Sequence, residues 1–164
     1  MYDIGDKVVC PMYGAGEIIS IEEKEILGEK QKYYVLRVPM GDMNILIPVK
    51  NVRNIGIRKI ISKQDADRVF PVFSEPVCID SSNWNKRYRD NMLKIKSGDI
   101  FKVADVVKTL LIRDKERGLS TGERKLLNNS KKILYSELIL ATNKNQDEIE
   151  ELIESSINSY INVC

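Results

Sequence analysis

The chain has 164 residues, of which 43% are hydrophobic and 30% are charged, and this balance is typical of a folded globular protein. Its apolar runs fall far short of the roughly 20 residues that a membrane-spanning helix needs. Acidic residues stand where a secretory signal would be basic and then apolar, so we expect a cytoplasmic protein with no membrane partner. Histidine is absent, which removes the commonest general base and metal ligand.

No sequence motif indicates catalysis. There is no phosphate-binding glycine loop, no dinucleotide-binding motif and no pair of acids at a catalytic spacing. Cys10, Cys78 and Cys164 are far apart in the sequence and form no metal-binding or dithiol motif, so we expect three reduced thiols. We therefore expect a protein that is not an enzyme, holds no cofactor or metal and has no small-molecule substrate.

The first 58 residues predict β structure. Segments rich in β-branched and aromatic residues alternate with turn signals such as Leu27-Gly28 and Gly41-Asp42. The expected strands are residues 7–11, 16–23, 32–38 and 43–48. Short antiparallel strands joined by tight turns predict a small twisted barrel or sandwich.

After residue 58 the apolar pattern changes to a helical period. Residues 59–83 predict a short helix that begins after Ser62, followed by a linker, and residues 84–164 predict a helical bundle. The expected helices are residues 84–96, an apolar stripe over residues 100–111, a helix that begins with the capping-box pattern Ser120 to Glu123, and a helix after Asn145. The fold class is therefore α+β, with a β domain at 1–58 and an all-α domain at 59–164.

The charges are distributed unevenly along the chain. Residues 1–58 have no net charge, whereas residues 84–134 carry 14 basic and 6 acidic side chains and residues 135–164 carry a net charge of −5. A basic segment of this kind indicates a surface that faces a polyanion. The competing interpretation is a solvated helix face, which a charge run by itself favours.

Trp84 is the only tryptophan and stands at the start of the basic segment. On a helix over 84–96, the residues on its face are Arg87, Tyr88 and Asn91. A lone tryptophan is usually a core or interface anchor. Its basic surroundings favour the alternative of an exposed ring that stacks on bases while nearby cations contact phosphates. The cations concerned are Lys86, Arg87, Arg89, Arg124 and Lys125.

Two motifs resemble those of the CarD/CdnL transcription regulators. The N-terminal IGDKVVCPMYGAGEI resembles the family's VGDxVVYPxxGxGxI, which the transcription-repair coupling factor shares in its RNA-polymerase-interacting domain. The later WNKRYRDNMLKIKSGDIFKVADVVKTLLIRDKERGLSTGE is similar to the more specific of the family's motifs. The resemblance covers about residues 3–140.

The resemblance implies a Tudor-like N-terminal domain that docks on the β subunit of bacterial RNA polymerase, and a helical domain that contacts promoter DNA. Family members stabilise the opened promoter without reading a sequence motif, and we expect a monomer. By resemblance, Trp84 is a wedge at the upstream edge of the bubble, and the DNA-contacting cations are Arg87, Arg89, Arg124 and Lys125. The implied polymerase-facing residues are Lys24, Asn44, Ile45, Leu46, Ile47 and Pro48, with Leu46 standing where some relatives have a basic residue.

Two other functions remain open at this point. One is a Tudor-like adaptor without direct DNA contact, whose basic helices bind an acidic protein. The other is an enzyme, although no convergent ionisable groups can be named for it. A DNA contact would weaken steeply with salt and require Trp84, whereas an adaptor would depend on the β domain alone.

Overall fold

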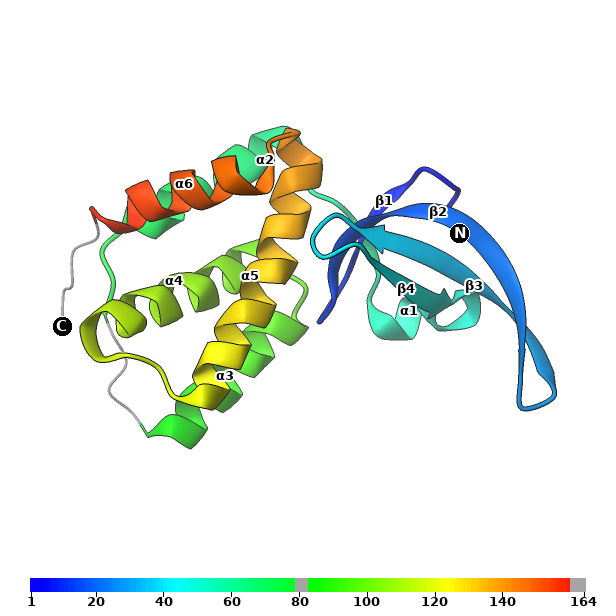
Figure 1. Ribbon diagram of the computed structural model, residues 1–164, viewed down its shortest axis with the longest axis horizontal. Coiled ribbons are helices and arrows are strands. Elements are labelled where there is room, and N and C mark those ends of the chain that lie inside the picture. The colour runs from blue at the N-terminus through cyan, green and yellow to red at the C-terminus, as the bar shows by residue number, and fades with distance from the viewer. Residues whose placement is uncertain (79–82, 160–164) are drawn as a thin grey trace.

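The computed structural model describes residues 1–78 and 83–159 and places a β-sheet before a group of helices (Figure 1). The sheet has five antiparallel strands in the order β4-β3-β2-β1-β5. The strands are β1 (Lys7–Cys10), β2 (Gly14–Ile26), β3 (Glu29–Val38), β4 (Met43–Pro48) and β5 (Arg58–Lys59). The expected α+β class, with the sheet first and the helices after it, is confirmed.

Strands β2 and β3 form a hairpin that is longer than the sequence predicted. Pairing continues to Ile26 opposite Glu29, beyond the expected strand over 16–23. Leu27 and Gly28 make the turn with φ values of 54° and 80°, the geometry of a two-residue hairpin loop. Residues 22–30 are exposed, so backbone pairing rather than burial extends the strands there, and the expected alternation is missing.

The sheet has an apolar core of its own. Its buried members are Val8, Cys10, Ile18, Tyr34, Leu36 and Ile47. Two short helices that the sequence did not predict, η1 (Val49–Asn51) and α1 (Val52–Ile55), add partly buried residues to it. The Tyr2 hydroxyl donates to the Ile57 carbonyl, and the Tyr2 amide donates to the Tyr34 hydroxyl. These bonds join the two ends of the β region.

The remaining helices begin largely where the sequence predicted, but one continues beyond the expected residue 111, and a 3₁₀ helix at 70–74 was not predicted. They are α2 (Lys63–Asp67), η2 (Phe70–Ser74), α3 (Trp84–Lys96), α4 (Ile100–Arg117), α5 (Thr121–Thr142) and α6 (Gln146–Ile157). Ser62 caps α2 by accepting a hydrogen bond from the Asp65 amide. Asn145 and Glu148 form a full capping box at α6. No described helix is both long and apolar enough to cross a membrane.

The cysteine expectation is only partly confirmed. Cys10 is a free thiol in the sheet core, where burial raises its pKa to about 11. Cys78 is disulfide-bonded, so the expectation of three reduced thiols is wrong. Separation along the sequence does not limit which cysteines approach each other in space. Cys164 lies outside the described residues.

Helix α5 lies between the sheet and the other helices and contacts both (Figure 1). A buried ion pair joins it to the sheet. Arg58 of β5 donates two hydrogen bonds to the Glu137 carboxylate, with Nη1···Oε2 and Nη2···Oε1 distances of 2.7 and 2.8 Å. Glu137, whose side chain is 3% exposed, also accepts from the Ile61 amide, while Arg58 Nε donates to the Gly98 carbonyl. These partners compensate the buried charge.

A second contact brings the backbone of β2 against α5. The Ala15 amide donates to Ser136 Oγ over 2.8 Å. A Cβ atom at Gly14 would lie 2.7 Å from the same oxygen, and Gly14 has φ = 115°. Only glycine allows both this approach and this backbone conformation. The GAG segment of the sequence therefore serves the junction between sheet and helices.

We predict that Glu137→Gln lowers the free energy of unfolding by about 2 to 3 kcal/mol, because it leaves the Arg58 charge without its carboxylate. The expected loss is below that of a fully buried pair because Arg58 is 31% exposed. Urea unfolding provides the measurement. Asp42→Asn, which removes an ion pair whose members are 62% and 91% exposed, is the control and should cost less than about 1 kcal/mol. Equal losses in the two variants would contradict the prediction.

Candidate nucleic-acid interface

Trp84 lies in the first turn of α3, directly after the N-cap residue Asn83. The Asn83 side chain accepts a hydrogen bond from the Lys86 amide over 2.9 Å, which starts the helix at this point. Residue Trp84 is 40% exposed. The expectation that this ring is exposed or only half packed is confirmed.

The covered part of the indole contacts two elements. Its Nε1–H group donates to Ser120 Oγ over 3.0 Å, and Ser120 is the N-cap of α5. Its ring stacks on Tyr88, one turn further along α3, with a centroid distance of 5.0 Å and an interplanar angle of 17°. Trp84 therefore marks the place where the first turns of α3 and α5 meet.

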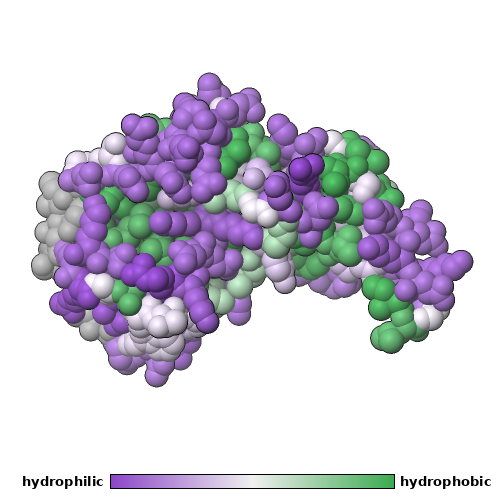
Figure 2. Space-filling model, viewed as in Figure 1, coloured by the Kyte–Doolittle hydropathy of each residue, from purple (hydrophilic) through white to green (hydrophobic). Residues whose placement is uncertain are grey.

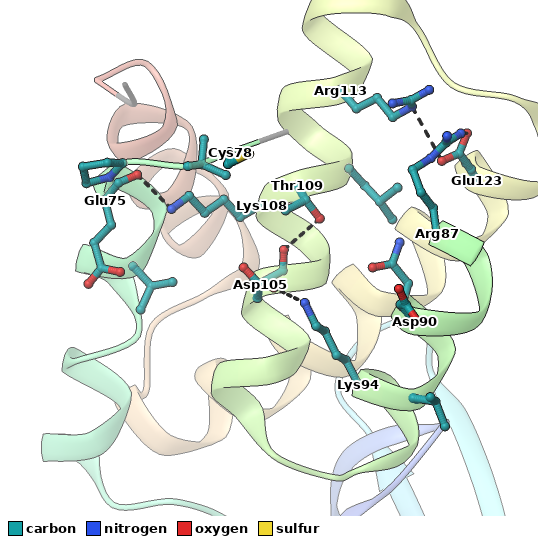
Figure 3. A pocket seen from close by; sticks show the side chains of 16 residues that line it. Glu75, Cys78, Arg87, Asp90, Lys94, Asp105, Lys108, Thr109, Arg113 and Glu123 are labelled. Atoms are coloured by element: carbon teal, nitrogen blue, oxygen red, sulfur yellow. Dashed lines mark hydrogen bonds and ion pairs between the residues drawn. The ribbon is translucent and has the colours of Figure 1, made fainter. Parts of the chain in front are cut away.

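Two arginines share one buried carboxylate beneath this junction. Arg87 Nη2 lies 3.5 Å from Glu123 Oε1, and Arg113 Nε lies 3.7 Å from Glu123 Oε2. Figure 3 shows both arginines directed at Glu123 from α3 and α4. The Glu123 side chain is only 5% exposed, so this ion-pair cluster ties α3, α4 and α5 together.

This cluster changes the interpretation of two residues. Arg87 was expected on an open basic face, but its side chain is 13% exposed. Glu123 was expected to complete a capping box at α5, but its carboxylate lies at the two arginines, and Ser120 caps the helix through the Glu123 amide. The helical period correctly placed Arg87 near Trp84, but it could not show that an acid from another helix faces it.

A cavity of about 640 Å³ lies beside the cluster, and Trp84 is not among its lining residues. Within it, Lys94 is paired with Asp105, and Lys108 donates to the Glu75 carbonyl over 2.9 Å (Figure 3). Desolvation lowers the pKa of Lys108, and the charges of Glu75 and Asp105 oppose that shift. Four acids and four bases line the cavity, so it lacks the single sign of charge that would select a nucleic acid.

Four of the five expected DNA-contacting cations are exposed, namely Lys86, Arg89, Arg124 and Lys125. Lys86 lies 3.8 Å from Asp90, and Arg124 lies 2.7 Å from Asp114. Both pairs are on the surface, where such contacts contribute little to stability. A phosphate can therefore compete for these cations at low cost.

The expected polymerase-facing residues divide between the two faces of the sheet. Directly opposed residues share a face, and the register places Val35 opposite Leu46 and Gln31 opposite Lys24. The residues on this outer face are Lys24, Asn44, Leu46 and Pro48. Ile45 and Ile47 point the other way, where Ile47 is buried and Ile45 packs on the sheet core. Leu46 is 42% exposed.

The comparisons with known proteins match both parts of the chain. Residues 2–61 match the family described as the CarD-like/TRCF RID domain, and residues 68–154 match the CarD C-terminal domain. The Bacillus subtilis (strain 168) protein YdeB, named as a proposed transcription factor, is 37% identical over 160 residues, which cover 98% of this chain and 99% of that protein.

Two solved structures from Myxococcus xanthus are also similar. The 72-residue N-terminal domain of CarD is 30% identical, and the match covers 36% of this chain and 79% of that chain with a TM-score of 0.32. CdnLNt is 44% identical, with 38% of this chain and 87% of that chain covered and a TM-score of 0.33.

Residues 2–61 match the RNA-polymerase-interacting type of domain, and the helices that follow carry exposed cations. This combination is typical of a class of transcription regulators. Within that class, the two family matches and the relative that is matched over its full length identify one family. The chain belongs to the CarD family.

Sequence reasoning did not identify several residues that contribute to these surfaces. Ser120 was seen only as a helix cap, and Arg113 received no role. Leu27, in the left-handed region at the hairpin turn, is fully exposed beside Ile26. Figure 2 shows apolar side chains at the far end of the molecule, where the β2–β3 hairpin ends in Figure 1. The Leu27-Gly28 turn signal was visible in the sequence, but its projection from the domain was not.

We predict that Arg87→Ala lowers the free energy of unfolding by about 1 to 3 kcal/mol, because it removes a mostly buried partner of Glu123. Arg89→Ala, two residues further along α3 and exposed, is the matched control and should change stability by less than about 0.5 kcal/mol. The measurement is the thermal unfolding temperature of the two variants and the wild type. If both leave the unfolding transition unchanged, Arg87 has no structural role.

Proposed function

We propose that this protein docks on the β subunit of RNA polymerase and stabilises the open promoter complex, with Trp84 inserted as a wedge at the upstream edge of the bubble. The observation that carries the proposal is the half-exposed indole of Trp84 at the junction of α3 and α5, with exposed cations on both helices, in a chain of the CarD family. Catalysis has no part in this function.

The stacking energy of the indole would supply the selectivity for open DNA. At the junction of duplex and melted DNA, an inserted ring gains stacking surface that a closed duplex does not offer, worth about 1 to 3 kcal/mol. A ligand that binds one state better shifts the equilibrium toward that state. A difference of 1.4 kcal/mol corresponds to about tenfold. Docking on the polymerase would supply the effective concentration that such a weak contact needs.

The exposed cations would hold the helical domain on the DNA without reading its sequence. Phosphate contacts position a protein but carry no base information. Lys86 and Arg89 on α3 and Arg124 and Lys125 on α5 are suited to this role because all four are exposed. Arg87 would act indirectly, by holding Glu123 and with it the start of α5.

Docking would use the free edge and outer face of the sheet. Strand β4 is the terminal strand in the sheet order, so one side of its backbone can pair with a strand of a partner. Leu46, exposed on the outer face, and Lys24, on the same face, would provide side-chain contacts. Ile45 and Ile47 would support the strand from the core side.

We predict that Leu46→Glu weakens binding to purified RNA polymerase by about tenfold or more, because it places a charge where an apolar side chain would be buried. Leu152→Glu on α6 is the matched control, since the two leucines are 42% and 39% exposed. The measurement is affinity at equilibrium with the full chain. An unchanged affinity in a folded Leu46→Glu variant would remove the outer face of β4 from the docking surface.

We predict that open complexes formed with Trp84→Ala decay as fast as those formed without the protein, while polymerase binding persists. Trp84→Phe should rescue in part, because it keeps an aromatic face with less area. Since Trp84 is 40% exposed, Trp84→Ala should cost less than the about 3 to 5 kcal/mol typical of a core aromatic. A large loss of melting temperature, with lifetime following the folded fraction, would make Trp84 a core anchor.

The adaptor alternative gives a different result in a DNA-binding assay. Under the proposed function, Arg89→Ala and Lys125→Ala each reduce the slope of log affinity against log salt by about one unit. An adaptor without direct DNA contact would show no change in that slope, and its effect on transcription would survive Trp84→Ala.

A further inference from the structure

The covered side of the Trp84 indole lies against the backbone of α5 at a glycine. A Cβ atom built on Gly122 would lie 3.0 Å from Cζ2 of Trp84, which is tighter than nearly all real Cβ contacts, and 3.8 Å from its Cη2, which is an ordinary van der Waals distance. Gly122 lies within α5 and has no positive φ, so its backbone conformation does not require glycine. A helix generally favours alanine over glycine by up to about 1 kcal/mol. The close approach of the indole therefore favours glycine at this position, since a larger residue would require the ring to shift.

The hydroxyl group of Ser120 holds the nitrogen end of the same ring. Its oxygen accepts hydrogen bonds from Trp84 Nε1–H at 3.0 Å and from the Glu123 amide at 3.2 Å, and the hydroxyl donates to Glu123 Oε1 at 3.4 Å. Both lone pairs and the proton are thus used. Glu123 is held in turn by Arg87 and Arg113, so the hydroxyl that fixes the indole is itself fixed.

Tyr88 covers another part of the indole by stacking at 5.0 Å. We propose that Tyr88, Ser120 and Gly122 form an indole cradle that positions Trp84 in one orientation before DNA is bound, and that satisfies its N–H group within the protein. The inference rests on the proposed function of Trp84 and deepens it. The three residues are positioning residues, because they act through Trp84 rather than through contacts of their own with the DNA.

The cradle has two consequences for a wedge. An aromatic ring that is already held in one orientation loses little side-chain freedom on insertion, so more of its stacking energy is available for binding. An indole whose N–H already donates to Ser120 offers no donor to the acceptors on base edges. The inserted group is then a ring without a hydrogen-bonding preference, so its contact with DNA would not depend on base sequence.

The test uses full-length Gly122→Ala, Ser120→Gly and Ser120→Thr. Trp84 is the only tryptophan, so acrylamide quenching and anisotropy of its fluorescence report directly on the free protein. For Gly122→Ala and Ser120→Gly we expect faster quenching and an open-complex lifetime shortened by about threefold to tenfold. Ser120→Thr keeps the hydroxyl and should behave like the wild type. Gly is a nearly neutral N-cap replacement, and Ala suits a helix, so both variants should melt within about 4 °C of the wild type.

Ser62→Gly is the matched control, because it changes the N-cap of α2 without touching Trp84. It should alter neither the fluorescence nor the lifetime. Gly122→Ala with unchanged quenching and unchanged lifetime would overturn the cradle, as would a lifetime that follows the melting temperature across all variants. If wild-type protein fails to lengthen the open-complex lifetime, the proposed function fails, and the fluorescence of the free variants still decides whether these residues position the indole.

Discussion

The ion pair between the partly exposed Arg58 and the buried Glu137 is the interaction on which the arrangement of this molecule depends most. Sheet and helices have separate clusters of buried apolar residues, and Met12 and Met40 of the β region pack against the helical cluster. Glu137 is compensated only when Arg58 and the Ile61 amide reach it, and Arg58 also bonds the Gly98 carbonyl. Because the desolvation cost of the buried Glu137 carboxylate is compensated only when these partners are in place, the ion pair favours that arrangement.

A second buried carboxylate, that of Glu123, holds helices together in the same way that Glu137 holds the sheet to α5. Glu123, at the start of α5, is held by arginines from α3 and α4, so the first turns of α3 and α5 meet. That meeting brings Ser120 to the indole nitrogen of Trp84. Polar groups buried where the helices meet thus set the geometry of the surface, while the exposed cations Lys86 and Arg124 form ion pairs at the surface. Charged residues near Trp84 consequently have two roles. The buried Glu123, with Arg87 and Arg113, holds the helices together, whereas the exposed cations are available to contact a partner.

The residue pattern predicted much of the candidate site, but not which of its charged residues are buried in ion pairs and which are exposed. The segment 84–96 was predicted as a helix with Trp84 at its start, and α3 spans these residues with Asn83 as its N-cap. Arg87 and Arg89 look equivalent in the sequence, yet only Arg87 is turned toward Glu123. Likewise, the alternation in β4 separates Leu46 from Ile45 and Ile47, but the pattern cannot show which face is covered. Such distinctions depend on partners that are distant in the sequence.

By itself the sequence determined the class of the fold, the order of sheet and helices, most helix boundaries and the family, because caps, periodicity and contiguous motifs are encoded within a few residues of each other. Only the tertiary structure decided that strand pairing in the hairpin continues to Ile26, that Arg58 reaches Glu137, and that Gly122 lies against Trp84. These last two contacts join residues that lie 79 and 38 positions apart. No local pattern specifies such pairs, since they result from how the packed elements bring distant side chains into contact.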